Sequence, residues 1–134
     1  MGKEEILRRF SDINNELNTM IDRNPRAAIE RARSLVSDGI LDQINIDMLK
    51  AGVLIDAGFI TKDSPAVDEG IAILEKLFVK MPESGMIGYN LANGLSAKAK
   101  LLTYRYPDWY CLTSDSRRRE RFLYQLLRDP AWIY

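Results

Sequence analysis

The stretch that decides the fold is residues 3–36, KEEILRRFSDINNELNTMIDRNPRAAIERARSLV. In its first part the apolar residues are spaced 4, 3, 4 and 3 apart, which is typical of one face of an α-helix. These residues are Ile6, Phe10, Ile13, Leu17 and Met20. Asn24 then offers a side-chain cap, and Pro25 suits the first position of a new helix. The stretch predicts helices at 3–22 and 25–37, the second ending near Gly39.

The rest of the chain repeats this pattern. We expect helices at 42–57, stopping near Gly58, and at 65–80, capped by Ser64 before Pro65. Two more are expected at 84–103 and 115–127. Helices joined by short turns pack antiparallel, so the six form the pairs 3–37, 42–80 and 84–127 of one all-α domain spanning 1–134. A row of such hairpins is typical of a short α-solenoid, with a compact helical bundle as the structural alternative.

The composition favours binding over catalysis. The chain has 134 residues, 46% of them hydrophobic, and its 19 basic and 19 acidic residues cancel. It has no His, so Ser-His-Asp and Cys-His catalysis and His-rich zinc sites are excluded within it. The single cysteine, Cys111, cannot form an internal disulfide. We expect no enzymatic activity, no metal and no cofactor, and a cytoplasmic protein without a membrane span.

Two segments are similar to known repeat helices. The segment 87–95, IGYNLANGL, resembles the first helix of a tetratricopeptide repeat, and Gly70, Leu74, Leu77 and Pro82 resemble its second helix. The segment 129–132, DPAW, resembles the junction that opens a following repeat. The resemblance implies divergent repeats stacked as a right-handed α-solenoid, whose groove binds a peptide or protein.

The last residues bear on whether the helical array continues beyond this sequence. Asp129-Pro130 has the chemistry of a helix start, yet only four residues follow Pro130. We expect the chain to be the N-terminal part of a longer protein. The alternative is that Trp132 and Tyr134 fold back as a cap.

The resemblance implies that ligands lie along the first helix of each pair. Asn90 and Asn93 are therefore candidate peptide-binding residues, because an amide can pair with both N–H and C=O of an extended peptide, and Tyr89 could add an aromatic contact. Asn14, Asn15 and Asn18 in the first helix are candidates of the same kind, with weaker placement. The alternative is that these asparagines are solvent-facing or interhelical polar residues. This alternative is favoured, because a single sequence is weak evidence for a binding site.

The last quarter of the chain is basic and aromatic. Arg117, Arg118 and Arg121 could form a patch for phosphate or an acidic partner. An exposed helix face is the favoured alternative, because residues 117–119 point in three directions around a helix. Four aromatic residues could form an interface with a partner or a homodimer contact through the C-terminal end. They are Trp109, Tyr110, Trp132 and Tyr134.

These observations favour a non-catalytic scaffold that binds a protein or peptide in the groove of stacked helix pairs. One alternative is a regulatory or sensor domain of a larger multidomain protein. A nucleic-acid-binding domain acting through the 117–121 helix is the least favoured, because no RNA-binding motif accompanies the arginines.

Overall fold

The computed structural model describes residues 2–105, and all the regular secondary structure within them is α-helix. The all-helical class predicted from the sequence is confirmed for this part of the chain. Its helices are α1 (Lys3–Arg23), α2 (Pro25–Arg33), α3 (Gln43–Ile60), α4 (Ser64–Lys80) and α5 (Gly85–Arg105). The predicted helix 115–127 lies outside the described residues.

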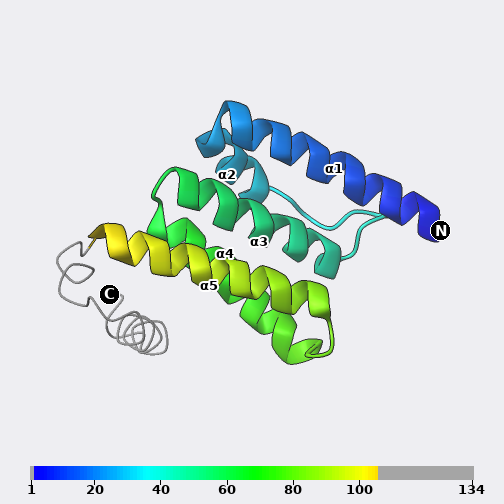
Figure 1. Ribbon diagram of the computed structural model, residues 1–134. Coiled ribbons are helices and arrows are strands. Elements are labelled where there is room, and N and C mark those ends of the chain that lie inside the picture. The colour runs from blue at the N-terminus through cyan, green and yellow to red at the C-terminus, as the bar shows by residue number, and fades with distance from the viewer. Residues whose placement is uncertain (1, 106–134) are drawn as a thin grey trace.

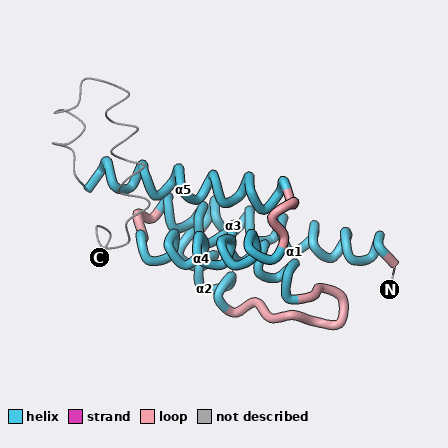
Figure 2. Tube along the Cα trace, turned by 90° about the horizontal axis from the view of Figure 1, so that it is seen from below, coloured by secondary structure: helices cyan, strands magenta, loops and turns pink. Residues whose placement is uncertain are grey.

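The helices alternate in direction. Figure 1 shows α1, α3 and α5 running the same way across the near side of the molecule, with α2 and α4 returning behind them. Each helix packs on the next one along the chain, and α1 and α5 both also contact α3. In the view from below, α5 and α2 lie on opposite sides (Figure 2). The expected antiparallel order of hairpins is therefore present within residues 2–105.

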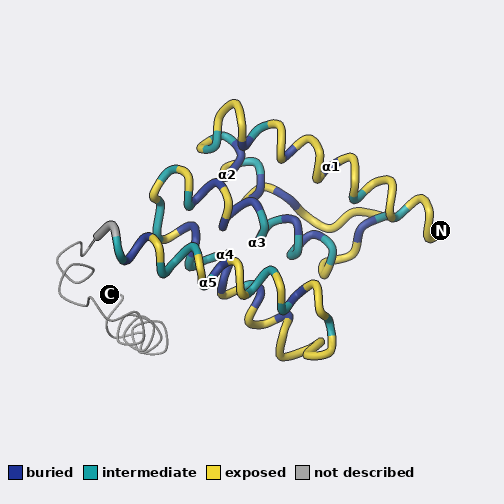
Figure 3. The backbone as a smooth tube through the Cα atoms, viewed as in Figure 1, coloured by how far each residue is buried: buried dark blue, intermediate teal, exposed yellow. Residues whose placement is uncertain are grey.

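Helix α3 is the centre of the fold because it supplies side chains to both cores. Leu49 and Leu54 belong to the core that α3 shares with α1 and α2. Ala51 and Ile55 belong to the core that it shares with α4 and α5. Buried positions accordingly recur along α3, whereas α1 is buried only on one stripe (Figure 3).

The predicted helix 25–37 is too long, because α2 ends at Arg33. Ser34 follows it, and its hydroxyl donates to the carbonyl oxygen of Arg31 at 2.7 Å. The chain then leaves the helix, which lets it bury both Leu35 and Leu41 in the first core. Val36 consequently stands 73% exposed instead of lying on the buried face.

The loop after α2 is held by a carboxylate, without a glycine at positive φ. Asp38 Oδ1 accepts hydrogen bonds from the backbone N–H of Ile40 at 2.8 Å and of Leu41 at 2.6 Å. Its other oxygen lies 3.5 Å from Nε of Arg9 on α1. Gly39, the predicted helix end, lies inside this loop with an ordinary negative φ.

The predicted stop of the third helix at Gly58 is also wrong, since α3 continues to Ile60. A Cβ at Gly58 would lie 3.0 Å from Val67 Cγ2, so this glycine serves the close contact of α3 with α4. The left-handed residue that ends the helix is Lys62, with φ 56°. The N–H groups of Lys62 and Asp63 bond to the carbonyls of Phe59 and Gly58 in a Schellman pattern.

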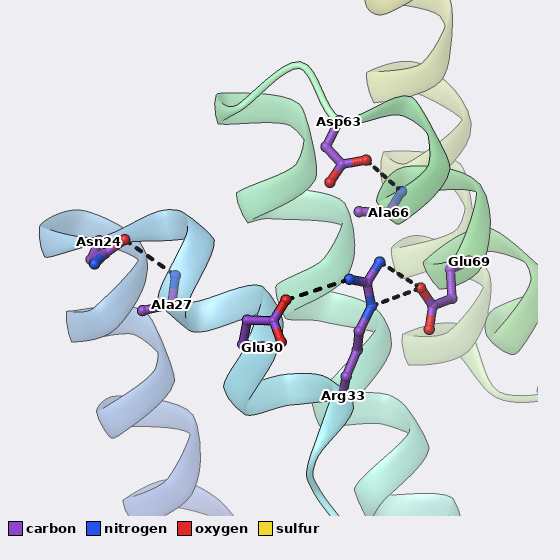
Figure 4. Close-up of polar contacts among 7 residues, drawn as sticks. All are labelled: Asn24, Ala27, Glu30, Arg33, Asp63, Ala66 and Glu69. Atoms are coloured by element: carbon purple, nitrogen blue, oxygen red, sulfur yellow. Dashed lines mark hydrogen bonds and ion pairs between the residues drawn. The ribbon is translucent and has the colours of Figure 1, made fainter.

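Charged residues connect the second helices of the hairpins (Figure 4). Arg33 of α2 donates from Nε and Nη2 to the same oxygen of Glu69 on α4, at 3.1 and 3.0 Å. The N-cap of α4 is Asp63 instead of the predicted Ser64, because its side chain accepts from the Ala66 N–H. Asn24 caps α2 in the same way, as predicted.

Candidate binding groove

A groove of about 490 Å³ opens where α1, α3 and α5 lie beside one another. These are the first helices of the successive pairs, and they run parallel in Figure 1. The groove takes its lining from the last two turns of α1, the C-terminal half of α3 and the middle of α5. No single element forms it, so it exists only because the three helices are packed together.

The apolar part of the groove comes mainly from α3. Ile55 is buried at its base, Phe59 is half-buried and Ile60 is exposed at its edge. Ile21 of α1 and Ala97 of α5 complete the apolar lining. A ligand that covers this surface would remove apolar area from water, which is favourable.

A glycine sets the distance between two walls. A Cβ on Gly94 would lie 2.8 Å from Cδ1 of Ile55 and 3.0 Å from Cγ1 of Ile71. Real Cβ atoms essentially never approach within 3.0 Å of another heavy atom, so a larger residue at position 94 would require Ile55 or α5 to shift. Gly94 thereby brings Asn93 and Ala97, its neighbours on α5, to the groove.

Four polar side chains line the groove: Asn18 and Asp22 from α1, Asp56 from α3 and Asn93 from α5. Asn18 and Asp22 are four residues apart and so share one helix face. Within residues 2–105, none of the four side chains makes a hydrogen bond or an ion pair. Asp56 is exposed at the groove, and its partial burial by neighbouring groups raises the pKa of its carboxyl.

Of the three residues predicted to bind a peptide, Asn93 lines the groove. Asn90, one turn earlier on α5, is half-buried and is not part of the lining. Tyr89 is 68% exposed and also lies outside it. The structure brings Asn93 together with Asn18, one of the three asparagines that the sequence offered on the first helix, whereas Asn14 and Asn15 are not part of the lining.

Asp22, Asp56 and Phe59 were missed from the sequence. Asp56 carried a usable signal, because it is the one charged residue in the otherwise apolar run 51–60, AGVLIDAGFI. A lone carboxylate in such a run has to reach a helix edge or a groove. Asp22 had no comparable signal, because only the packing of α1 on α3 places it opposite Asp56.

The other candidate residues lie outside the described residues. These are the patch of Arg117, Arg118 and Arg121 and the aromatic residues Trp109, Tyr110, Trp132 and Tyr134. Cys111 falls in the same part of the chain.

A second hollow of about 320 Å³ lies between α2 and the turn from α3 to α4. Three charged side chains of its lining, Glu30, Arg33 and Asp63, already have partners. Arg33 pairs with Glu30 and with Glu69 of α4, and Asp63 caps α4 (Figure 4). A third hollow, of about 500 Å³, is lined by α1 and Asn24 alone. The groove between α1, α3 and α5 is therefore lined by more helices than either of these hollows. It also has more polar side chains without a partner among residues 2–105.

Comparison with protein-family models, with curated proteins and with solved structures found no match. Within residues 2–105, no cluster of three or more Cys, Asp or Glu side chains is arranged to hold a metal ion. No helix in this same range has the length and apolar character that a membrane crossing requires.

Proposed function

We propose that this chain is a non-catalytic binding module whose groove between α1, α3 and α5 takes an extended peptide or a peptide segment of a protein. The observation that carries the proposal is the set of four polar side chains around an apolar base, none of which has a partner among residues 2–105. Apolar pockets select side chains of such a ligand, and amides hold its backbone.

The proposed architecture is a short right-handed α-solenoid of the tetratricopeptide type. Its support is the order of contacts, in which each helix packs on its successor and the first helices of neighbouring pairs also touch. In such an array α5 would be the first helix of a third pair, and the helix expected from the sequence at 115–127 would be the second. The first helices then line one continuous surface, which is where the groove lies.

Alanine substitutions of the asparagines test this function. Wild-type chain and the double variant Asn18→Ala/Asn93→Ala are each used to select from a library of random twelve-residue peptides displayed on phage. For peptides selected by the wild type, we expect the variant to raise Kd about tenfold, since it removes two polar contacts worth about 0.5–1.5 kcal/mol each.

The matched control is Asn15→Ala/Asn90→Ala, on the same two helices. Neither of these side chains lines the groove, so Kd should stay within twofold of the wild type. Equal losses in both variants would place the binding elsewhere, and failure of the wild type to select any peptide would contradict the proposed function.

A further inference from the structure

The groove lining contains two carboxylates and no cationic side chain. Asp22 belongs to the last turns of α1, and Asp56 to the C-terminal half of α3. Neither forms an ion pair with a residue of the described range. The lining itself is therefore acidic.

Three cations of α5 and α1 lie close in sequence to lining residues, and two of them have contacts of their own. Lys98 pairs with Asp68 of α4 through Nζ and Oδ1 at 2.8 Å. Lys100 Nζ lies 5.9 Å from the centroid of the Phe59 ring, so this cation reaches a residue of the lining. Arg23, although next to Asp22 in sequence, lines the separate hollow on α1.

Apolar surface adjoins both acidic groups. Ile55 and Phe59 lie one residue before and three residues after Asp56 on α3, and Ile21 precedes Asp22 on α1. Lys and Arg have long aliphatic stems that cover apolar surface while their charged ends stay near water or a carboxylate. An apolar surface with carboxylates beside it therefore suits the aliphatic stem and the charged end of a Lys or Arg side chain.

We propose that the ligand of this groove is a peptide segment carrying Lys or Arg beside an apolar side chain, with the cation held between Asp22 and Asp56 and the apolar side chain on Ile55 and Phe59. This inference rests on the proposed function and adds the chemistry of the ligand.

A synthetic peptide series tests the inference. The probes are acetylated, amidated heptapeptides with constant Leu and Phe positions, in which the intervening polar positions are all Lys, all Arg, all Gln or all Glu. Binding to the full chain is measured by fluorescence anisotropy. We expect the Lys and Arg peptides to bind about fivefold to tenfold more tightly than the Gln peptide, as two partly exposed ion pairs allow, and the Glu peptide to bind least.

The variant Asp22→Asn/Asp56→Asn should abolish this preference while leaving the Gln peptide's Kd within twofold. Both substitutions keep side-chain volume and remove only charge, and circular dichroism checks the fold. The single variant Asp56→Asn provides a second test. It should reduce the preference for the Lys peptide over the Gln peptide to half or less. The matched control is Glu75→Gln/Glu83→Gln, which changes the net charge equally at exposed positions outside the groove and should keep the full preference.

The two failures are distinguishable. If the peptides bind and Asn18→Ala/Asn93→Ala weakens them, but Lys, Arg, Gln and Glu peptides bind equally, this inference is wrong and the proposed function stands. The same holds if Glu75→Gln/Glu83→Gln removes the preference as effectively as the groove variant. If neither this series nor the random library yields a ligand, both proposals are contradicted.

Discussion

Ile55 is the residue through which α3 meets both α4 and α5. A Cβ on Gly70 would lie 2.8 Å from Ile55 Cγ1, and a Cβ on Gly94 would lie 2.8 Å from Ile55 Cδ1. The side chain of Ile55 therefore occupies space that two glycines leave free on neighbouring helices. The groove geometry depends on this contact, because Ile55 is also its buried base.

Substituting Gly70 with Ala should destabilise the chain by about 1–3 kcal/mol, because overpacking a tight contact shifts backbone or side chains. The added Cβ would also lie 2.9 Å from the backbone oxygen of Ala51, which cannot move as a side chain can. Urea denaturation monitored by circular dichroism measures the change.

Gly52 provides the matched control in α3, because a Cβ there meets nothing within 4 Å. Gly52→Ala should stabilise the chain by about 0.5–1 kcal/mol, since alanine is the better helix former. A destabilising Gly52→Ala, or a neutral Gly70→Ala, would show that the contact of α3 with α4 is looser than described.

Asp56 should give a pH-dependent effect on stability. Partial burial raises the pKa of Asp56 in the folded chain, so folding favours the protonated carboxyl. The protonated form's contribution to stability is present below the ordinary pKa of 3.8 and is lost as pH rises through the folded pKa. Asp56→Asn removes the charge, so it should raise Tm at pH 7 and give no gain near pH 3. Thermal melts across this range test it, and a lowered Tm at pH 7 would contradict the desolvated setting of Asp56.

At the scale of elements, the sequence predicts the five described helices but misplaces two of their ends. The apolar spacing of α1 and the Asn24-Pro25 start of α2 are local features, so they can be read directly. Gly39 and Gly58 misled the prediction because glycine also serves loops and close helix contacts. The true ends depend on burial of Leu35 and Leu41 and on Lys62, which adopts φ 56° without being glycine.

The loop between α2 and α3 depends on Asp38. The hydrogen bond from the Leu41 N–H, and after it the one from the Ile40 N–H, hold the pKa of the Asp38 carboxyl below its ordinary value of 3.8. Desolvation raises this pKa slightly, and the nearby Arg9 lowers it further. The stability that the charged form contributes is present above that value and lost as pH falls through the lowered folded pKa.

Asp38→Ala should therefore lower Tm at pH 7, by an amount that shrinks as pH falls below about 3.8. Thermal melts at several pH values measure it. Asp12→Ala, at an exposed carboxylate of α1, is the control and should show no such loss. A pH-independent effect of Asp38→Ala would mean that the charge of Asp38 does not organise the loop.

At the scale of the whole molecule, the groove is a product of packing between helices far apart in the sequence. The repeat resemblance points to the first helix of each pair, so the sequence could offer the asparagines of α1 and α5 as candidates. It could not separate Asn18 and Asn93 from Asn14, Asn15 and Asn90, which do not line the groove. It could not predict that Asp22 of α1 and Asp56 of α3 line the same groove, since 33 intervening residues separate them. The solenoid and the helix at 115–127 stay predictions of the repeat resemblance.

The groove as a peptide-binding site is tested most directly by mapping backbone amide shifts of the ¹⁵N-labelled full chain during titration with a peptide selected from the random library. The account predicts that the largest shift changes fall on Asn18, Asp22, Asp56, Phe59 and Asn93. Largest changes on the outer faces of α2 and α4, with these five amides unmoved, would contradict it.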